Sequence, residues 1–274
     1  MEFNKKLIDV SNKNNSLLCV GLDIDEKNVP KSLLNSSKDP LFEFNKFIIK
    51  YTKDIVCAYK LNLAFYEVFG KKGIDLLLKT IDYIPKDIII IVDGKRNDIG
   101  NTAKKYAQTI FDNYKADATT LNPYMGLDSI APFLAYESKC SFILCRTSNP
   151  SARDFQDIKV SETPFYQIVA RKIKNWNLKN NCGAVAGATY PEELKIIRNI
   201  LGEDIPILIP GLGKQGGDVE KTIKYGTNKE GEMAIINSSR GIIFAGKDDR
   251  FYEKSREEAL ILRNTINKIK YGSA

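Results

Sequence analysis

The hydrophobic residues of this chain fall into short apolar runs, which are separated by longer segments with a helical alternation of apolar and polar residues. Ile88 to Val92 form a run of β-branched residues, which is typical of a strand buried on both faces in a parallel sheet. The runs that predict strands cover residues 17–23, 55–62, 88–93, 116–122, 140–146, 182–188, 205–210 and 232–238.

The segments between these runs predict amphipathic helices, with one more after the last run. They cover residues 42–55, 65–84, 101–114, 126–138, 163–176, 190–202, 216–225 and 252–270. This repeated alternation in a chain of 274 residues predicts an α/β fold, a TIM (β/α)8 barrel with right-handed crossovers, formed as one domain over residues 1–274. A doubly wound open sheet is the alternative. Roughly the first dozen residues predict an extra N-terminal helix across the barrel bottom.

The charge of the chain is moderately basic, because 41 Lys and Arg residues exceed 34 Asp and Glu residues. A net charge of +7 favours anionic ligands such as phosphates. There is no long block of like charge and no basic stripe interleaved with aromatic residues, so we do not expect nucleic acid as a partner.

The cysteine and histidine contents restrict the cellular compartment and the side chains that could act as acid or base. The 5 cysteines include no CxxC pair, which favours a reduced, cytoplasmic compartment over a disulfide framework or a zinc site. No apolar stretch reaches the length of a signal peptide or a membrane span. Because the chain contains no histidine, acid and base chemistry at neutral pH would need another side chain, and a lysine mechanism becomes a leading hypothesis.

Polar residues stand at the ends of several predicted strands, where apolar packing would not select them. In a barrel of this type, side chains at the carboxyl ends of the strands surround the active site. Residues two apart on a strand point the same way, so Asp93 and Lys95 share a face if the strand continues that far. A lysine beside carboxylates remains protonated and acts as an acid. The polar residues at strand ends are Asp23, Lys60, Asn62, Asp93, Lys95, Asn122, Arg146, Asn237 and Arg240.

Asp98 lies beyond the third strand, where a helix begins. A capping role at the helix N-terminus is one interpretation of Asp98, and Asn101 or Thr102 could equally be the cap.

Two loops near the C-terminal end of the chain predict a phosphate site. The seventh strand is followed by the glycine-rich segment PGLGKQGG, and the eighth by NSSRG. Glycine-rich loops expose backbone N–H groups, and an arginine can hold phosphate with its planar guanidinium. Loops after strands seven and eight are the usual phosphate site of this barrel, so we expect a phosphorylated substrate.

The motifs together resemble the orotidine 5'-phosphate decarboxylase family, in its bacterial-type (type 2) branch with the signature DxKRxDIGxT. VDGKRNDIGNT carries the resemblance, and YKLN, CRTSNP, PGLGKQGG and NSSRG support it in order between Leu18 and Gly246. The resemblance implies a homodimer of barrels that converts orotidine monophosphate to uridine monophosphate and carbon dioxide, the last step of de novo UMP biosynthesis. It implies neither a metal nor an organic cofactor.

The resemblance also implies roles for the matched residues. Lys95 would donate a proton to carbon six of the pyrimidine, within a charge network of Lys60, Asp93, Lys95 and Asp98. Asp98, Ile99 and Thr102 would reach the neighbouring subunit's site. The substrate would be held at its ribose hydroxyls by Asp23, Lys60 and Asn62, at its pyrimidine by Thr147, Ser148 and Pro210, and at its phosphate by Gln215, Arg240 and the backbone of Ser239.

Three other interpretations are weaker. The 3-keto-gulonate 6-phosphate decarboxylases share the barrel and a DxKxxD strand, but they need magnesium, a glutamate where this chain has Lys60, and a histidine. A Schiff-base aldolase would need a lysine in an apolar pocket, which differs from Lys95 among carboxylates. A non-catalytic basic protein that binds nucleic acid would leave the charge cluster unexplained.

Overall fold

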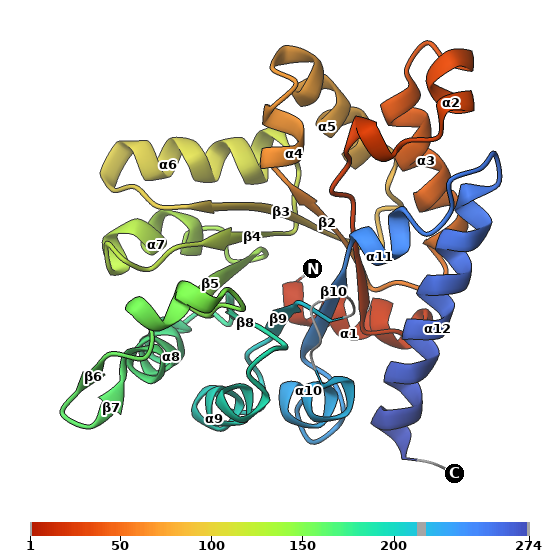
Figure 1. Ribbon diagram of the computed structural model, residues 1–274. Coiled ribbons are helices and arrows are strands. Elements are labelled where there is room, and N and C mark those ends of the chain that lie inside the picture. Colours follow the sequence, from red (N-terminus) through yellow and green to blue (C-terminus); the bar gives the residue numbers. More distant parts are fainter. Residues whose placement is uncertain (1, 213–217, 273–274) are drawn as a thin grey trace.

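The computed structural model describes residues 2–212 and 218–272, and its parallel strands close into a barrel (Figure 1). The predicted TIM barrel is therefore confirmed. Every predicted strand is present, and the third extends past its predicted end at residue 93 as far as Arg96. Around the barrel the strands follow the order β1-β10-β9-β8-β5-β4-β3-β2. They are β1 (Leu18–Gly21), β2 (Ala58–Asn62), β3 (Ile89–Arg96), β4 (Ala118–Leu121), β5 (Cys140–Arg146), β8 (Cys182–Ala186), β9 (Ile207–Pro210) and β10 (Ala234–Ser238).

Helices cover the outside of the ring of strands (Figure 1). The helices that the sequence predicts correspond to α3 (Pro40–Thr52), α5 (Lys71–Tyr83), α6 (Gly100–Gln108), α7 (Leu127–Leu134), α8 (Phe165–Trp176), α9 (Pro191–Leu201), α10 (Val219–Gly226) and α12 (Phe251–Tyr271). Short elements that were not predicted are α2 (Lys31–Ser36), α11 (Arg240–Ile243), the 3-10 turns Glu26–Asn28 and Pro150–Asp154, and a hairpin of β6 (Lys159–Val160) and β7 (Thr163–Pro164).

Two predicted helices are interrupted. The segment 65–84 divides into α4 (Ala64–Glu67) and α5, because Gly70 adopts a φ of 59°, a left-handed conformation that a helix cannot include. The segment 101–114 changes from α6 into a π-helical turn over Thr109–Asn113. Both segments are helical, as their sequence periodicity predicts, but neither forms one continuous α-helix.

The predicted N-terminal helix is α1 (Phe3–Lys13), and it closes the amino-terminal end of the barrel. The ring of Phe3 packs edge-on against Phe142 of β5, with ring centroids 5.8 Å apart. Lys6 pairs with Asp117, just before β4, at 2.7 Å. The end of α12 reaches the same region, because the hydroxyl of Tyr271 lies 3.1 Å from Oδ1 of Asn15, which precedes β1.

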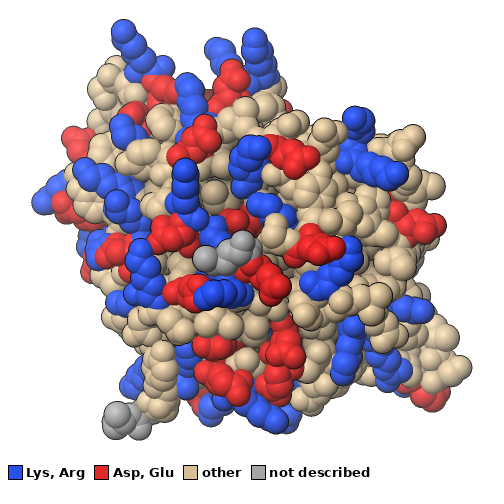
Figure 2. Space-filling model, turned by 180° about the vertical axis from the view of Figure 1, so that it is seen from behind, with Lys and Arg blue, Asp and Glu red and all other residues tan. Residues whose placement is uncertain are grey.

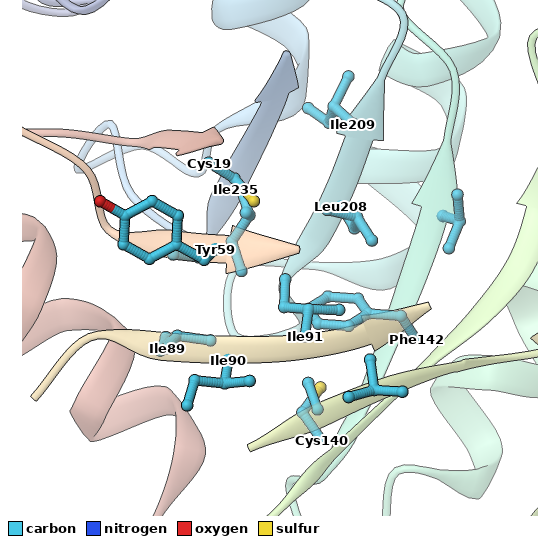
Figure 3. Close-up of a cluster of buried hydrophobic side chains, with 14 of the residues drawn as sticks. Cys19, Tyr59, Ile89, Ile90, Ile91, Cys140, Phe142, Leu208, Ile209 and Ile235 are labelled. Atoms are coloured by element: carbon cyan, nitrogen blue, oxygen red, sulfur yellow. The ribbon is translucent and has the colours of Figure 1, made fainter. Parts of the chain in front are cut away.

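Apolar side chains fill the barrel interior and the layer between strands and helices. Ile89 to Val92 of β3 are buried, as expected for a strand covered on both faces. Figure 3 shows Ile91, Phe142 and Leu208 gathered inside the ring of strands. All 5 cysteines are free and buried, so they behave as small apolar core residues.

The molecular surface carries mixed charge. On the face opposite to that of Figure 1, basic and acidic side chains are interspersed (Figure 2). None of the helices within the described residues is long and apolar enough to cross a bilayer.

Candidate active site

A cavity of about 620 Å³ opens at the carboxyl ends of the barrel strands. It collects side chains that are far apart in the sequence, since parallel strands bring their carboxyl ends to one rim. The predicted site residues that line it are Asp23, Lys60, Asp93, Lys95, Thr147, Ser148, Pro210, Ser239 and Arg240. Asn62, Asp98, Ile99 and Thr102 do not line it, and Gln215 lies outside the described residues.

A charge cluster occupies one side of this cavity. The two carboxylate oxygens of Asp93 accept hydrogen bonds from different lysines, Lys60 at 2.8 Å and Lys95 at 2.7 Å. Lys60 also lies 3.9 Å from Oδ1 of Asp23. The side chains of Lys60 and Asp93 are only 6% and 7% exposed, whereas that of Lys95 is 48% exposed. The cluster therefore has one accessible ammonium group, that of Lys95, which is held in place by buried ionised side chains.

The pKa values of Asp93 and Lys60 both shift in the direction that keeps these side chains charged. Burial alone would raise the pKa of Asp93, but Lys60 and Lys95 outweigh burial and hold this pKa well below its ordinary value. Burial alone would lower the pKa of Lys60, but Asp93 and Asp23 raise it above its ordinary value. Both groups are thus ionised at neutral pH.

The end of β3 departs from regular strand geometry. Asp93 and Lys95 meet, as the sequence suggested, but simple alternation is not the reason. The pairing with β4 shifts between Val92 and Arg96, and Lys95 has a φ of 46°, in the left-handed region. A Cβ on the intervening Gly94 would lie 2.8 Å from Leu63, so glycine suits this bend. The bulge turns the Lys95 side chain back toward Asp93.

The start of α6 holds three predicted site residues outside the cavity. Ile99 is 49% exposed, and Thr102 is also exposed. Oδ1 of Asp98 accepts a hydrogen bond from the backbone N–H of Ile99, at 2.8 Å. Ile99 is the N-cap residue of α6 and makes no side-chain cap bond, so the capping interpretation of Asp98, Asn101 or Thr102 is wrong.

Asn62 has a local role in the single chain. Its Oδ1 accepts a hydrogen bond from the backbone N–H of Ala64 at 3.1 Å, where α4 begins. The side chain is half-buried and adjoins Asp93 in the sheet register. Asn62 is therefore near the charge cluster but does not line the cavity.

Another part of the cavity wall is formed by the loop after β10. Ser239 and Arg240 lie there, and Pro210 comes from the end of the neighbouring β9. A Cβ on Gly21 of β1 would come within 1.9 Å of the Ser239 hydroxyl oxygen, so only glycine allows this close approach. Arg240 begins the short α11 and is exposed.

Thr120 and Gln156 are among the polar residues of the cavity that were not singled out from the sequence. The Thr120 hydroxyl, on β4, donates a hydrogen bond to Oδ1 of Asp93 at 2.7 Å. Gln156, after β5, accepts from the Thr147 backbone N–H at 2.8 Å and donates to the Thr147 hydroxyl at 2.9 Å. Thr120 stands at a strand end, which is a weak sequence signal, whereas a glutamine in a loop gives none.

The guanidinium of Arg146 supports the loop that carries Thr147 and Ser148. It is buried, lies 3.9 Å above the centroid of the Tyr190 ring, and reaches Gln156 and Asp157 at 3.3 Å.

Within residues 2–212 and 218–272, no three His, Cys, Asp or Glu side chains are grouped as metal ligands.

The sequence and structure were compared with known proteins. Residues 16–254 match the model of the orotidine 5'-phosphate decarboxylase / HUMPS family. Orotidine 5'-phosphate decarboxylase of Dehalococcoides mccartyi strain BAV1 is 46% identical, with 97% of this chain and 98% of that protein covered. The enzyme of the same name from Cellvibrio japonicus is also 46% identical, with the same coverage. The structure of Leishmania donovani OMP decarboxylase is similar with a TM-score of 0.86 and 34% identity, and the match covers 100% of both chains.

Proposed function

Because the chain belongs to the orotidine 5'-phosphate decarboxylase family and converts orotidine 5'-monophosphate to uridine 5'-monophosphate, we propose that Lys95 is the proton donor of this reaction. The observation that carries the proposal is the charge cluster. Lys95 is the member of the cluster whose ammonium group is substantially exposed to the cavity, and Asp93 holds it at 2.7 Å. A group that is fixed before reaction and aimed at developing charge stabilises a transition state most effectively.

The chemistry requires a cation at this position. When the bond between carbon six and the carboxylate breaks, its electron pair remains on carbon six in the ring plane, where it cannot delocalise into the π system. The Lys95 ammonium stabilises this pair electrostatically and then gives it a proton, forming the new C–H bond. Lys95 is left as a neutral amine and takes a proton from solvent before the next turnover.

Asp93 contributes by repelling the substrate carboxylate as well as by positioning the Lys95 ammonium. A carboxylate 4 Å from the substrate carboxylate costs about 4 kcal/mol at an effective dielectric of about 20. This cost disappears as carbon dioxide leaves. The loss of this repulsion favours the product side of the bond cleavage, and the same carboxylate holds the Lys95 ammonium in place until its proton is transferred.

The rest of the cavity suits a nucleoside monophosphate. We assign the ribose hydroxyls to Asp23, Lys60 and Asn62. In support, Oδ1 of Asp23 is buried and has no hydrogen-bond partner among the described residues, so it can accept from a hydroxyl group.

We assign the pyrimidine to Thr147, Ser148 and Pro210, and the phosphate to Ser239, Arg240 and Gln215. The charge of the lining supports this assignment, because Arg240 supplies a cation to the cavity in addition to the lysines of the charge cluster. The energy of phosphate binding can then be used to hold carbon six against Lys95.

We also propose that the chain works in the cytoplasm as a homodimer, in which Asp98, Ile99 and Thr102 complete the site of the partner subunit. Two observations support the dimer. These residues lie at the start of the helix that follows the Lys95 bulge, and Ile99 leaves an apolar side chain 49% exposed there. The free, buried cysteines suit a reducing compartment.

The test of the proton donor compares wild-type protein, Lys95→Ala and Lys13→Ala, a matched control on the exposed side of α1. We expect wild type and Lys13→Ala to reduce the absorbance of orotidine monophosphate equally, with or without a chelator, and Lys95→Ala to be inactive. Equal turnover by Lys95→Ala, or loss of wild-type activity on chelation, would contradict the proposal.

The shared site is tested by mixing two inactive variants, Lys95→Ala and Asp98→Ala. Random exchange of subunits makes half of the dimers mixed, and each mixed dimer has one intact site, so about a quarter of wild-type activity should return. If each subunit uses its own Asp98, no activity returns. Sedimentation of Ile99→Asp tests the dimer itself, and we expect it to be monomeric.

A further inference from the structure

The irregular end of β3 leaves backbone groups without their usual partners on β4. Val92 is in register with Thr119, and Arg96 is in register with Leu121. An advance of four residues along β3, from Val92 to Arg96, therefore matches an advance of two along β4. Thr120 alone lies opposite the stretch from Asp93 to Lys95. A bulge of this kind interrupts the ladder of backbone hydrogen bonds.

The side chain of Thr120 replaces the missing backbone partner. Its hydroxyl oxygen accepts a hydrogen bond from the Lys95 backbone N–H at 2.9 Å. The same hydroxyl donates to Oδ1 of Asp93 at 2.7 Å. This Asp93 oxygen in turn accepts from the Lys95 ammonium at 2.7 Å. Backbone and side chain of Lys95 are thus joined through Thr120 and Asp93 in one closed ring of hydrogen bonds.

Only a hydroxyl can make both of these contacts. It accepts from an N–H group while it donates its single proton to a carboxylate, and Thr120 itself is only 2% exposed. The left-handed φ of Lys95 is unfavourable for a residue with a side chain, so the conformation needs support from its surroundings.

We propose that Thr120 is a positioning residue for the decarboxylation, which holds the Lys95 backbone in its left-handed conformation and fixes the Asp93 oxygen that orients the ammonium group. This inference rests on the proposed role of Lys95. Without the hydroxyl, the bulge relaxes and the ammonium moves away from carbon six while the cavity retains its shape.

The test uses Thr120→Val, which keeps the side-chain shape and removes the hydroxyl. Misplacement of a catalytic group by about 1 Å can reduce the rate about 100-fold, so we expect kcat to fall about 100-fold with little change in KM. Thr120→Ser restores the hydroxyl and should recover kcat to within about threefold of wild type, since it keeps both hydrogen bonds.

Thr119→Val is the matched control. Thr119 is the neighbouring residue on β4, equally buried, and its hydroxyl donates to the backbone oxygen of Val92 at 2.8 Å, away from the charge cluster. We expect this variant to keep the wild-type kcat. Should Thr120→Val not fold, as judged by circular dichroism, Thr120→Ala removes the same hydroxyl without adding a methyl group in its place.

The outcomes separate this inference from the assignment of Lys95. If Lys95→Ala is inactive but Thr120→Val retains the wild-type kcat, or Thr120→Ser is impaired as much as Thr120→Val, the positioning role of Thr120 is wrong. If Lys95→Ala itself is active, the proposed proton donor is wrong.

Discussion

Replacement of Lys60 by methionine tests how the buried charges of the site are balanced. Nζ of Lys60 lies 2.8 Å from Asp93 and 3.9 Å from Asp23. At an effective dielectric of about 20, these separations correspond to attractions of about 6 and about 4 kcal/mol. Removal of three charges from water opposes them with several kcal/mol for each ion. The net stabilisation is therefore much smaller than the sum of the attractions.

The variant Lys60→Met keeps much of the side-chain volume but leaves carboxylates without their shared cation. Removal of one partner of a buried ion pair costs about 3 to 5 kcal/mol, because the other charge remains buried. Asp93 keeps its bonds from Lys95 and Thr120, so we expect a loss near the lower limit, about 3 kcal/mol of the free energy of unfolding at neutral pH.

Urea unfolding, followed by the fluorescence of Trp176, measures this difference. The matched control is Lys13→Met, which breaks an ion pair with Asp87 of 2.6 Å whose side chains are 66% and 48% exposed. Exposed pairs contribute less than about 1 kcal/mol, so the control should resemble wild type. The reasoning is refuted if both variants lose the same free energy.

Three other predictions concern pH, packing and loop support. Because the pKa of Asp93 is depressed, its pairing stabilises the fold above about pH 4, and this stability should be lost in urea unfolding as the pH falls further; constant stability from neutral pH to about pH 3 would contradict it. Gly183→Ala would place a methyl group 2.4 Å from the Phe142 ring, and overpacking should cost about 1 to 3 kcal/mol; an unchanged melting temperature would show that the interior has room. Arg146→Lys keeps the charge but loses the planar stacking on Tyr190, so KM should rise more than kcat falls in steady-state assays; an unchanged KM would exclude support of the substrate loop.

The barrel could be predicted from the sequence because its strands are short, apolar and regularly spaced. Burial on both faces forces a run such as Ile88 to Val92 to be apolar throughout, and a polar residue at its end then indicates the rim of the barrel. The same logic predicts that Lys60 and Asp93 lie close together, since parallel strands end at one rim.

Other features depend on contacts that the sequence pattern does not encode. The bulge at Lys95 arises from the register between β3 and β4, and a left-handed lysine has no sequence signature. The break at Gly70 lies within a helical period that continues on both sides. Gln156 enters the site only because Arg146 and Thr147 hold its loop there.

The closure of one barrel end by α1 has a practical consequence. Phe3 and Tyr271 both lie at this end, on the side of the barrel remote from the charge cluster. A tag, a tether to a solid support or a fused partner attached to either terminus would therefore project away from the entrance that the nucleotide uses. Immobilised protein should turn over its substrate as fast as the protein in free solution.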